Sequence, residues 1–210
     1  NLLLLSHDRL KADDNVARGL VVAAESNSPF IDSENPESVM FWSDGAGAIL
    51  LGKDDSSSAG LRGRAHLANT ESNMAVRLPW ESFPGEAGSP PGRRTQGVEM
   101  GGLATWRQAT SGLPQVVRAA LADADMTLDD VDHVVFHQAN LRMLEYLVRK
   151  MRIPEEKVLL NVQEVGNLGA ASIPVMLAQA NAREVFAPGD TVLMAAVGAG
   201  FTFVAAIWEW

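Results

Sequence analysis

Cysteine is absent from the 210-residue sequence, which excludes disulfide bonds, thiolate metal sites and a cysteine nucleophile among these residues. Histidine is also scarce, with four in all, and we expect no metal site. No apolar run reaches the roughly 18 residues that a membrane-spanning helix needs. The 17 basic residues are outnumbered by 26 acidic ones, and the net charge of −9 argues against a nucleic-acid surface. We therefore expect a soluble, cytoplasmic protein that binds neither nucleic acid nor a membrane.

What the sequence does contain is the composition of a globular α/β protein, with 47% hydrophobic and 20% charged residues. The run GLVVAAE at 19–25 predicts a buried strand, because continuous Val, Leu and Ala mark strands that are covered on both faces. Residues 191–197 and 201–210 predict a hairpin across a Gly-Ala-Gly turn. Strand and helix patterns alternate along the chain, so we expect an α/β layered fold with a mixed sheet. The helical patterns lie at about 1–12, 99–124, 140–151 and 169–183.

This alternation is lost over residues 69–98, which contain four prolines and a Gly-Arg-Arg run. A structureless stretch of this length inside a compact domain is usually a functional loop or an insertion. We therefore expect three parts, comprising residues 1–68, an irregular loop or insertion at 69–98, and residues 99–210.

Two polar residues stand where apolar elements end. His137 follows the strand pattern VVF and precedes a helix, and Asn167 lies in a glycine-flanked turn before an Ala-rich helix. Ligand sites in open α/β sheets gather at the carboxyl ends of strands, where such loops converge. The backbone N–H groups of VGAGF at 197–201 could face the same crevice.

Each of these features also has an ordinary structural interpretation. A single histidine at a strand end is more often structural than catalytic, and an Asn between glycines is usually a turn residue. A Gly-Ala-Gly sequence is usually only a hairpin turn. The residues by themselves leave both interpretations open.

Four stretches of the sequence resemble β-ketoacyl-acyl-carrier-protein synthase III, a family of the thiolase superfamily. The resemblance implies a thiolase-like layered αβαβα fold, with residues 1–68 as the remainder of the N-terminal half and residues 99–210 as the C-terminal half. The Asp-Gly-Ala-Gly motif at 44–47 is then structural and lets the two halves pack closely. The matching stretches are SDGAGAILLG (43–52), VDHVVFHQANLRML (131–144), NVQEVGNLGAASIPVML (161–177) and PGDTVLMAAVGAGFTFVAAI (188–207).

The resemblance implies that His137 and Asn167 are two members of a Cys-His-Asn catalytic triad. Both would donate hydrogen bonds to a thioester carbonyl oxygen and stabilise the enolate that forms when a malonyl thioester loses CO₂. The tautomer of His137 stays open, because a base at this position would need the opposite one. The third member is the cysteine that this chain lacks. NLLLLSHDRLKADD resembles the rest of the helix that carries the nucleophile, so we expect that cysteine a few residues before Asn1.

The same resemblance assigns lesser roles by position. Asn140 matches a residue that contacts the pantetheine arm of the substrate, and Arg142 matches one that docks acyl carrier protein. Ala199 stands where a glycine N–H often completes the oxyanion hole. Arg142 lies in a basic cluster with Arg149, Lys150 and Arg152, although a plain solvated helix face is equally compatible with Arg149 and Lys150.

The leading hypothesis is therefore an acyltransferase that joins an acyl thioester to a malonyl thioester by decarboxylative Claisen chemistry, in fatty-acid or polyketide synthesis. It implies no cofactor, acyl-CoA and malonyl-carrier protein as substrates, acyl carrier protein as a partner, and a homodimer or a pairing with a homologous chain. One alternative is a starter-unit or O/N-acyl transferase on the same fold. A second is a non-catalytic partner of a cysteine-bearing homologue, which the absence of cysteine would suit.

Overall fold

The computed structural model describes residues 1–31, 39–54, 58–77 and 98–210. Its helices are α1 (Leu2–Ala12), α3 (Gly102–Asp123), α4 (Leu141–Met151), α5 (Val162–Val165) and α6 (Ser172–Ala182), with short 3-10 turns η1 (Ser28–Phe30), η3 (Glu155–Lys157) and η4 (Gly169–Ala171). Its strands are β1 (Arg18–Glu25), β2 (Gly45–Gly52), β3 (Gly60–Ala68), β4 (Val76–Arg77), β5 (Glu99–Met100), β6 (His133–Phe136), β7 (Thr191–Gly198) and β8 (Thr202–Glu209).

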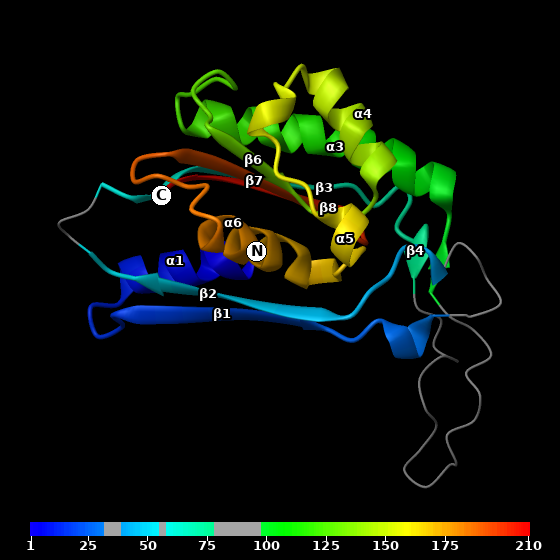
Figure 1. Cartoon of the computed structure of the whole chain (residues 1–210), viewed down its shortest axis with the longest axis horizontal. Helices are drawn as coiled ribbons and strands as arrows, with labels where there is room; N and C mark the ends of the chain where they lie inside the picture. The colour runs from blue at the N-terminus through cyan, green and yellow to red at the C-terminus, as the bar shows by residue number, and fades with distance from the viewer. Residues whose placement is uncertain (32–38, 55–57, 78–97) are drawn as a thin grey trace, which may run out of the picture.

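These elements stack in alternating layers of sheet and helix (Figure 1). The antiparallel pair β1–β2 forms one outer layer, and α1 and α6 lie between it and a four-stranded sheet. Helices α3 and α4 cover the other face of that sheet. Buried apolar side chains therefore form two cores, one on each face of the four-stranded sheet. The predicted layered α/β fold is confirmed.

The four-stranded sheet has the order β3-β8-β7-β6. Strand β6 runs parallel to β7, whereas β7–β8 and β3–β8 are antiparallel, so the sheet is mixed as predicted. The predicted hairpin at the end of the sequence is confirmed as β7–β8. Strand β3 lies at the end of the part predicted to close at residue 68, yet it pairs with β8. The four-stranded sheet therefore combines one strand from residues 1–68 with three strands from residues 99–210.

Helix α1 confirms the helix expected at the start of the sequence, and it buries Leu4 and Leu10. Strand β1 confirms the strand expected at residues 19–25, but the prediction that both of its faces are covered is wrong for this structure. Among the described residues, helices cover one face of the β1–β2 pair, and the opposite face exposes Leu20, Val22 and Leu50 by 53–65%. Within the described parts of the chain, we find no helix with the length and hydropathy needed to span a membrane. The segment 78–97 of the predicted loop lies outside the described residues.

Small residues hold the layers close together. A Cβ on Gly47 would lie 2.7 Å from Pro174 Cβ, so β2 and α6 can approach only because this position is glycine. A Cβ on Gly112 of α3 would overlap the ring of Phe203 in β8. The packing role predicted for the Asp-Gly-Ala-Gly motif is thus confirmed at Gly47, and the close contacts fix the helices relative to the sheet that carries the site.

Candidate active site

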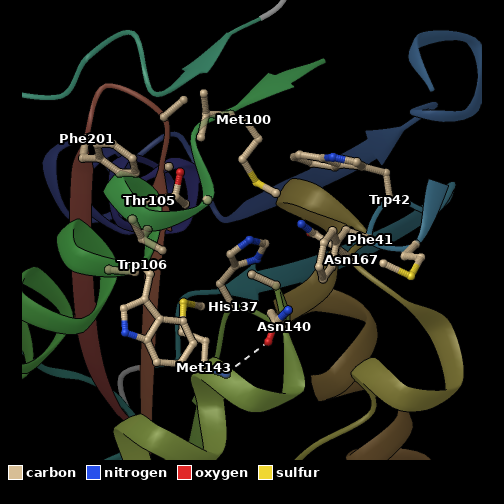
Figure 2. Close-up of a pocket in the computed structure, with 18 residues that line it drawn as sticks. Phe41, Trp42, Met100, Thr105, Trp106, His137, Asn140, Met143, Asn167 and Phe201 are labelled. Carbon is tan, nitrogen blue, oxygen red and sulfur yellow. Dashed lines mark hydrogen bonds between the residues drawn. The ribbon is translucent and has the colours of Figure 1, made fainter. Parts of the chain in front are cut away.

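A pocket of about 450 Å³ opens where β6, β7 and the start of α3 meet (Figure 2). Most of its lining is apolar or aromatic, and His137, Asn140 and Asn167 from three separate segments reach it. Such a cavity, apolar with a few convergent polar groups, is typical of a small-molecule site. The lining residues are Met40, Phe41, Trp42, Val76, Met100, Gly102, Thr105, Trp106, Ala109, His137, Ala139, Asn140, Met143, Asn167, Val197, Gly198, Ala199 and Phe201.

His137 stands at the carboxyl end of β6, as its place in the sequence predicts. Its backbone N–H donates to the carbonyl of Ala195 in β7 at 2.8 Å and extends the parallel ladder by one step. The ring Nδ1 lies 2.7 Å from the hydroxyl oxygen of Ser172, the first residue of α6. Burial in apolar surroundings lowers the pKa of His137 to about 4, so the imidazole is neutral near pH 7.

Asn167 is buried in the turn between α5 and α6. The chain enters this turn at Gly166 with a φ of +72°, a conformation that glycine adopts without steric cost. The Asn167 Oδ1 accepts the Gly169 N–H at 2.9 Å. Because the carboxamide oxygen is held by the turn, its NH₂ is the group left to face the pocket (Figure 2).

Asn140 is oriented in a similar way. It is the N-cap of α4, and its Oδ1 accepts the N–H of Met143 at 3.1 Å. The cap satisfies a backbone donor that the helix leaves open, and it turns the Asn140 NH₂ away from the helix end. In the hairpin turn between β7 and β8, Ala199 also lines the pocket.

The polar side of the pocket therefore offers donors from two carboxamides and an imidazole, together with the hydroxyl of Thr105. The two carboxamides present NH₂ groups, and the neutral imidazole carries one N–H. No carboxylate is found among the described lining residues. Donors fixed in a water-poor site stabilise an oxygen that gains negative charge, typically by a few kcal/mol for each donor. The arrangement can hold a carbonyl oxygen or an enolate oxygen.

The structure thus brings His137, Asn167, Asn140 and Ala199 to one pocket, and it leaves Arg142 outside. Arg142 lies on the exposed surface of α4, where its side chain is 83% exposed and pairs with Glu145 at 3.3 Å.

Lys150, one of the predicted basic cluster, makes a hydrogen bond to the neighbouring helix α3. Its Nζ donates at 2.8 Å to the carbonyl of Thr110 in α3. That carbonyl lacks its usual helical donor, because residue 114 is a proline without an N–H.

Sequence reasoning missed two polar partners of this site. Ser172 contacts His137, and Gln138 is fully buried beneath it. The Gln138 NH₂ donates to the carbonyls of Phe136 and Leu159, and its Oε1 accepts the N–H groups of Asn161 and Val162. Gln138 lies in the matching stretch 131–144 and Ser172 in the stretch 161–177, so their proximity in sequence to His137 and Asn167 was the available signal.

Aromatic and hydroxyl groups of the lining were missed as well. Trp42, Trp106 and Thr105 all line the pocket, although none of them was assigned to a site from the sequence. Thr105 and Trp106 lie on the first turns of α3, a segment for which the sequence predicted a helix and no site residue. Only the arrangement of α3 against β7 places them beside His137.

Comparison with protein families matches two parts of the chain. Residues 3–68 match the model described as 3-oxoacyl-(acyl carrier protein) synthase III, and residues 121–210 match the model of its C-terminal part. A β-ketoacyl-(acyl carrier protein) synthase III of Rhizorhabdus wittichii is 34% identical over 94% of this chain and 61% of its own length. The protein of the same name from Porphyra umbilicalis is 33% identical over 91% of this chain and 59% of its own length. The chain therefore spans about six tenths of the curated relatives that it matches.

Solved structures agree with these relatives. A 3-oxoacyl-(acyl carrier protein) synthase III from Pseudomonas aeruginosa superposes with a TM-score of 0.86 at 28% identity, over all of this chain and 63% of the other. The corresponding protein of Aquifex aeolicus has a TM-score of 0.86 at 26% identity, over 99% of this chain and 64% of the other. The fold is thus the thiolase-like layered fold that the resemblance implied. Because residues 3–68 and residues 121–210 match the two models of this family, the chain belongs to the 3-oxoacyl-(acyl carrier protein) synthase III family.

Proposed function

We propose that the chain carries the enolate-forming part of a decarboxylative condensing enzyme, with His137 and Asn167 as its catalytic residues. The proposed reaction joins an acyl thioester to a malonyl thioester in fatty-acid or polyketide synthesis, and it uses no cofactor. One observation carries the proposal: the carboxamide of Asn167 and the neutral imidazole of His137 both reach an apolar pocket, with the amide oxygen already engaged by Gly169.

The chemistry needs these groups. When the bond between the carboxylate carbon and C2 of the malonyl group breaks, CO₂ leaves and the electron pair forms a thioester enolate. Two N–H donors to the enolate oxygen lower the energy of this step. The enolate carbon then attacks the carbonyl of the acyl thioester and expels its thiolate, which yields a ketone. The thiol that carries the acyl group lies outside these 210 residues, because they contain no cysteine.

The carbonyl of the second thioester also develops negative charge when the enolate attacks it. We assign the backbone N–H of Ala199 to that oxygen, since Ala199 lines the same pocket. Asn140 would contact the arm of the thioester through its NH₂, which the helix cap leaves free. Both assignments accompany the main proposal and depend on it.

The test is CO₂ release from malonyl-CoA by the whole polypeptide encoded by the reading frame that contains these residues. Asn167→Asp keeps the oxygen that accepts the Gly169 N–H but removes the donor, so we expect kcat to fall about 100-fold. His137→Ala should have a loss of similar size. Asn181→Asp makes the same chemical change at an exposed site on α6 and should keep full activity.

Persistent CO₂ release in both variants would overturn the roles of His137 and Asn167. Transfer of an acyl group to an alcohol or amine, without any decarboxylation by the wild type, would favour the O/N-acyl transferase. An inert wild-type polypeptide that restores activity to a cysteine-bearing homologue would favour the partner subunit.

We also propose acyl carrier protein as a partner, docking at Arg142. The exposed position of this side chain on α4, just beyond Asn140 at the pocket, supports the assignment, and an acidic carrier would complement its charge. Arg142→Glu should raise KM for malonyl-carrier protein about tenfold and leave KM for malonyl-pantetheine unchanged. Arg118→Glu, at an exposed site on α3, is the matched control. Equal effects of Arg142→Glu on both substrates would contradict carrier docking.

A further inference from the structure

Ser172 makes a contact that the proposed reaction does not by itself explain. Its hydroxyl oxygen lies 2.7 Å from His137 Nδ1, and only 1% of the residue is exposed. The two residues come from different layers, since His137 ends β6 in the four-stranded sheet and Ser172 begins α6 between the sheets. The segment 167–172 therefore supplies the Asn167 donor and also contacts the histidine.

The hydrogen-bond pattern around this hydroxyl indicates its direction. The backbone N–H of Gln138 donates to the Ser172 oxygen at 3.4 Å, which occupies one acceptor position. A serine hydroxyl has one hydrogen to donate, and His137 Nδ1 is its other partner among the described residues. If Nδ1 carried the proton and donated to Ser172, the serine hydrogen would be buried without an acceptor, which proteins rarely tolerate.

We propose that Ser172 is a positioning residue that donates its hydroxyl hydrogen to His137 Nδ1 and so fixes the imidazole as the tautomer protonated at Nε2. This tautomer presents its N–H to the pocket, where the proposed enolate oxygen forms. The opposite tautomer would present a lone pair there and act as a base. The functional consequence rests on the proposed function, whereas the tautomer itself does not.

The test reads the tautomer directly, by long-range ¹H–¹⁵N correlation on the whole polypeptide with ¹⁵N-labelled histidine at pH 7. The His137 signals are assigned as those lost in His137→Gln. We expect the wild type to show the Nε2-protonated pattern. In Ser172→Ala a population protonated at Nδ1 should appear, and Ser172→Thr, which keeps a hydroxyl, should restore the wild-type pattern. A wild type protonated at Nδ1, or an unchanged pattern in Ser172→Ala, would overturn the inference.

Kinetics supply the second measurement. If the competent tautomer falls from nearly all molecules to between a half and a tenth, kcat for CO₂ release falls two- to tenfold. KM for malonyl-CoA should not change, because Ser172 does not line the pocket. A shifted tautomer with an unchanged kcat would overturn the role of Ser172 in the reaction. If the wild type releases no CO₂, the proposed function fails, and the spectra still decide which tautomer Ser172 imposes.

Discussion

Asn167 and Trp42 are joined by a short parallel bridge, although 125 residues separate them in sequence. The Asn167 N–H donates to the Phe41 carbonyl at 2.9 Å, and the Ser43 N–H donates to the Asn167 carbonyl at 3.0 Å. The proposed donor is thus held by the segment that leads into β2, as well as by its own turn. Its position depends on the close approach of these two segments.

Gly166→Ala should disturb this approach. An alanine there would take a φ of +72° and a ψ of −164°, a region open almost only to glycine, and its Cβ would overlap Ser43 Oγ. We expect the free energy of unfolding to fall by about 2–4 kcal/mol and CO₂ release to fall with it. Urea denaturation and the malonyl-CoA assay measure the two effects.

Gly189→Ala is the matched control for that variant. Gly189 also has a positive φ, of +93°, but a Cβ there meets no atom within 4 Å. Gly189→Ala should lower the free energy of unfolding by about 1 kcal/mol, through backbone strain alone, and should retain CO₂ release. Equal costs at the two positions would contradict a specific role for the contact with Ser43.

Asn140 allows its two hydrogen-bonding groups to be separated. Asn140→Asp keeps an oxygen that can accept the Met143 N–H and cap α4, but it removes the NH₂ at the pocket. We expect unchanged stability and a raised KM for malonyl-CoA. Asn140→Ala removes both groups and should also lose about 1 kcal/mol of stability. If Asn140→Asp binds the substrate as the wild type does, the NH₂ has no role in binding.

The partly buried His137 should make stability depend on pH. Its pKa is about 4 in the folded protein and 6.5 in an unfolded chain, so between these values the unfolded state binds the extra proton. Above pH 6.5 His137 is neutral in both states and does not lower the free energy of unfolding. As the pH falls from 6.5 towards 4, protonation of the unfolded state lowers the free energy of unfolding, by about 3 kcal/mol in all. In His137→Gln this dependence should vanish, so the stability difference between the two proteins should shrink on acidification. Parallel stability curves from urea denaturation at pH 4.5–7.5 would contradict the lowered pKa of His137.

Gln138 should be a structural residue despite its place in the motif. Its side chain satisfies two carbonyls and two N–H groups that tie β6 to residues 159–162. Gln138→Met, of similar size, leaves these partners unpaired and should cost about 3–5 kcal/mol in urea denaturation. Gln115→Met, at an exposed site on α3, should cost less than about 0.5 kcal/mol. A loss of activity at full stability in Gln138→Met would show a direct role in the reaction.

The sequence predicted what depends on local pattern. His137 and Asn167 were predicted as site residues because each follows an apolar element and the motifs around them resemble a known family, and the structure places both at one pocket. Long-range pairings were missed, since nothing in residues 60–68 indicates that β3 joins β8 rather than β2. Ser172 was missed for the same reason. Its partner, His137, lies 35 residues away in sequence, and only the packing of α6 against the sheet brings the two side chains together. Lys150 looked like a surface cation because its acceptor, the Thr110 carbonyl, is open only through the proline at 114 in α3.

The absence of charged side chains from the described pocket lining has a consequence for a malonyl carboxylate under the proposed function. Among the described residues that form this lining, His137 is the only titratable one, and near pH 7 it is neutral. A carboxylate that enters therefore meets no countercharge and loses much of its hydration, which raises its free energy. Departure of CO₂ moves that negative charge onto the thioester oxygen, within reach of the amide and imidazole N–H groups. Under the proposed function, the pocket would promote decarboxylation in two ways. It gives the malonyl carboxylate no countercharge, and it offers hydrogen-bond donors to the enolate oxygen that takes up the negative charge.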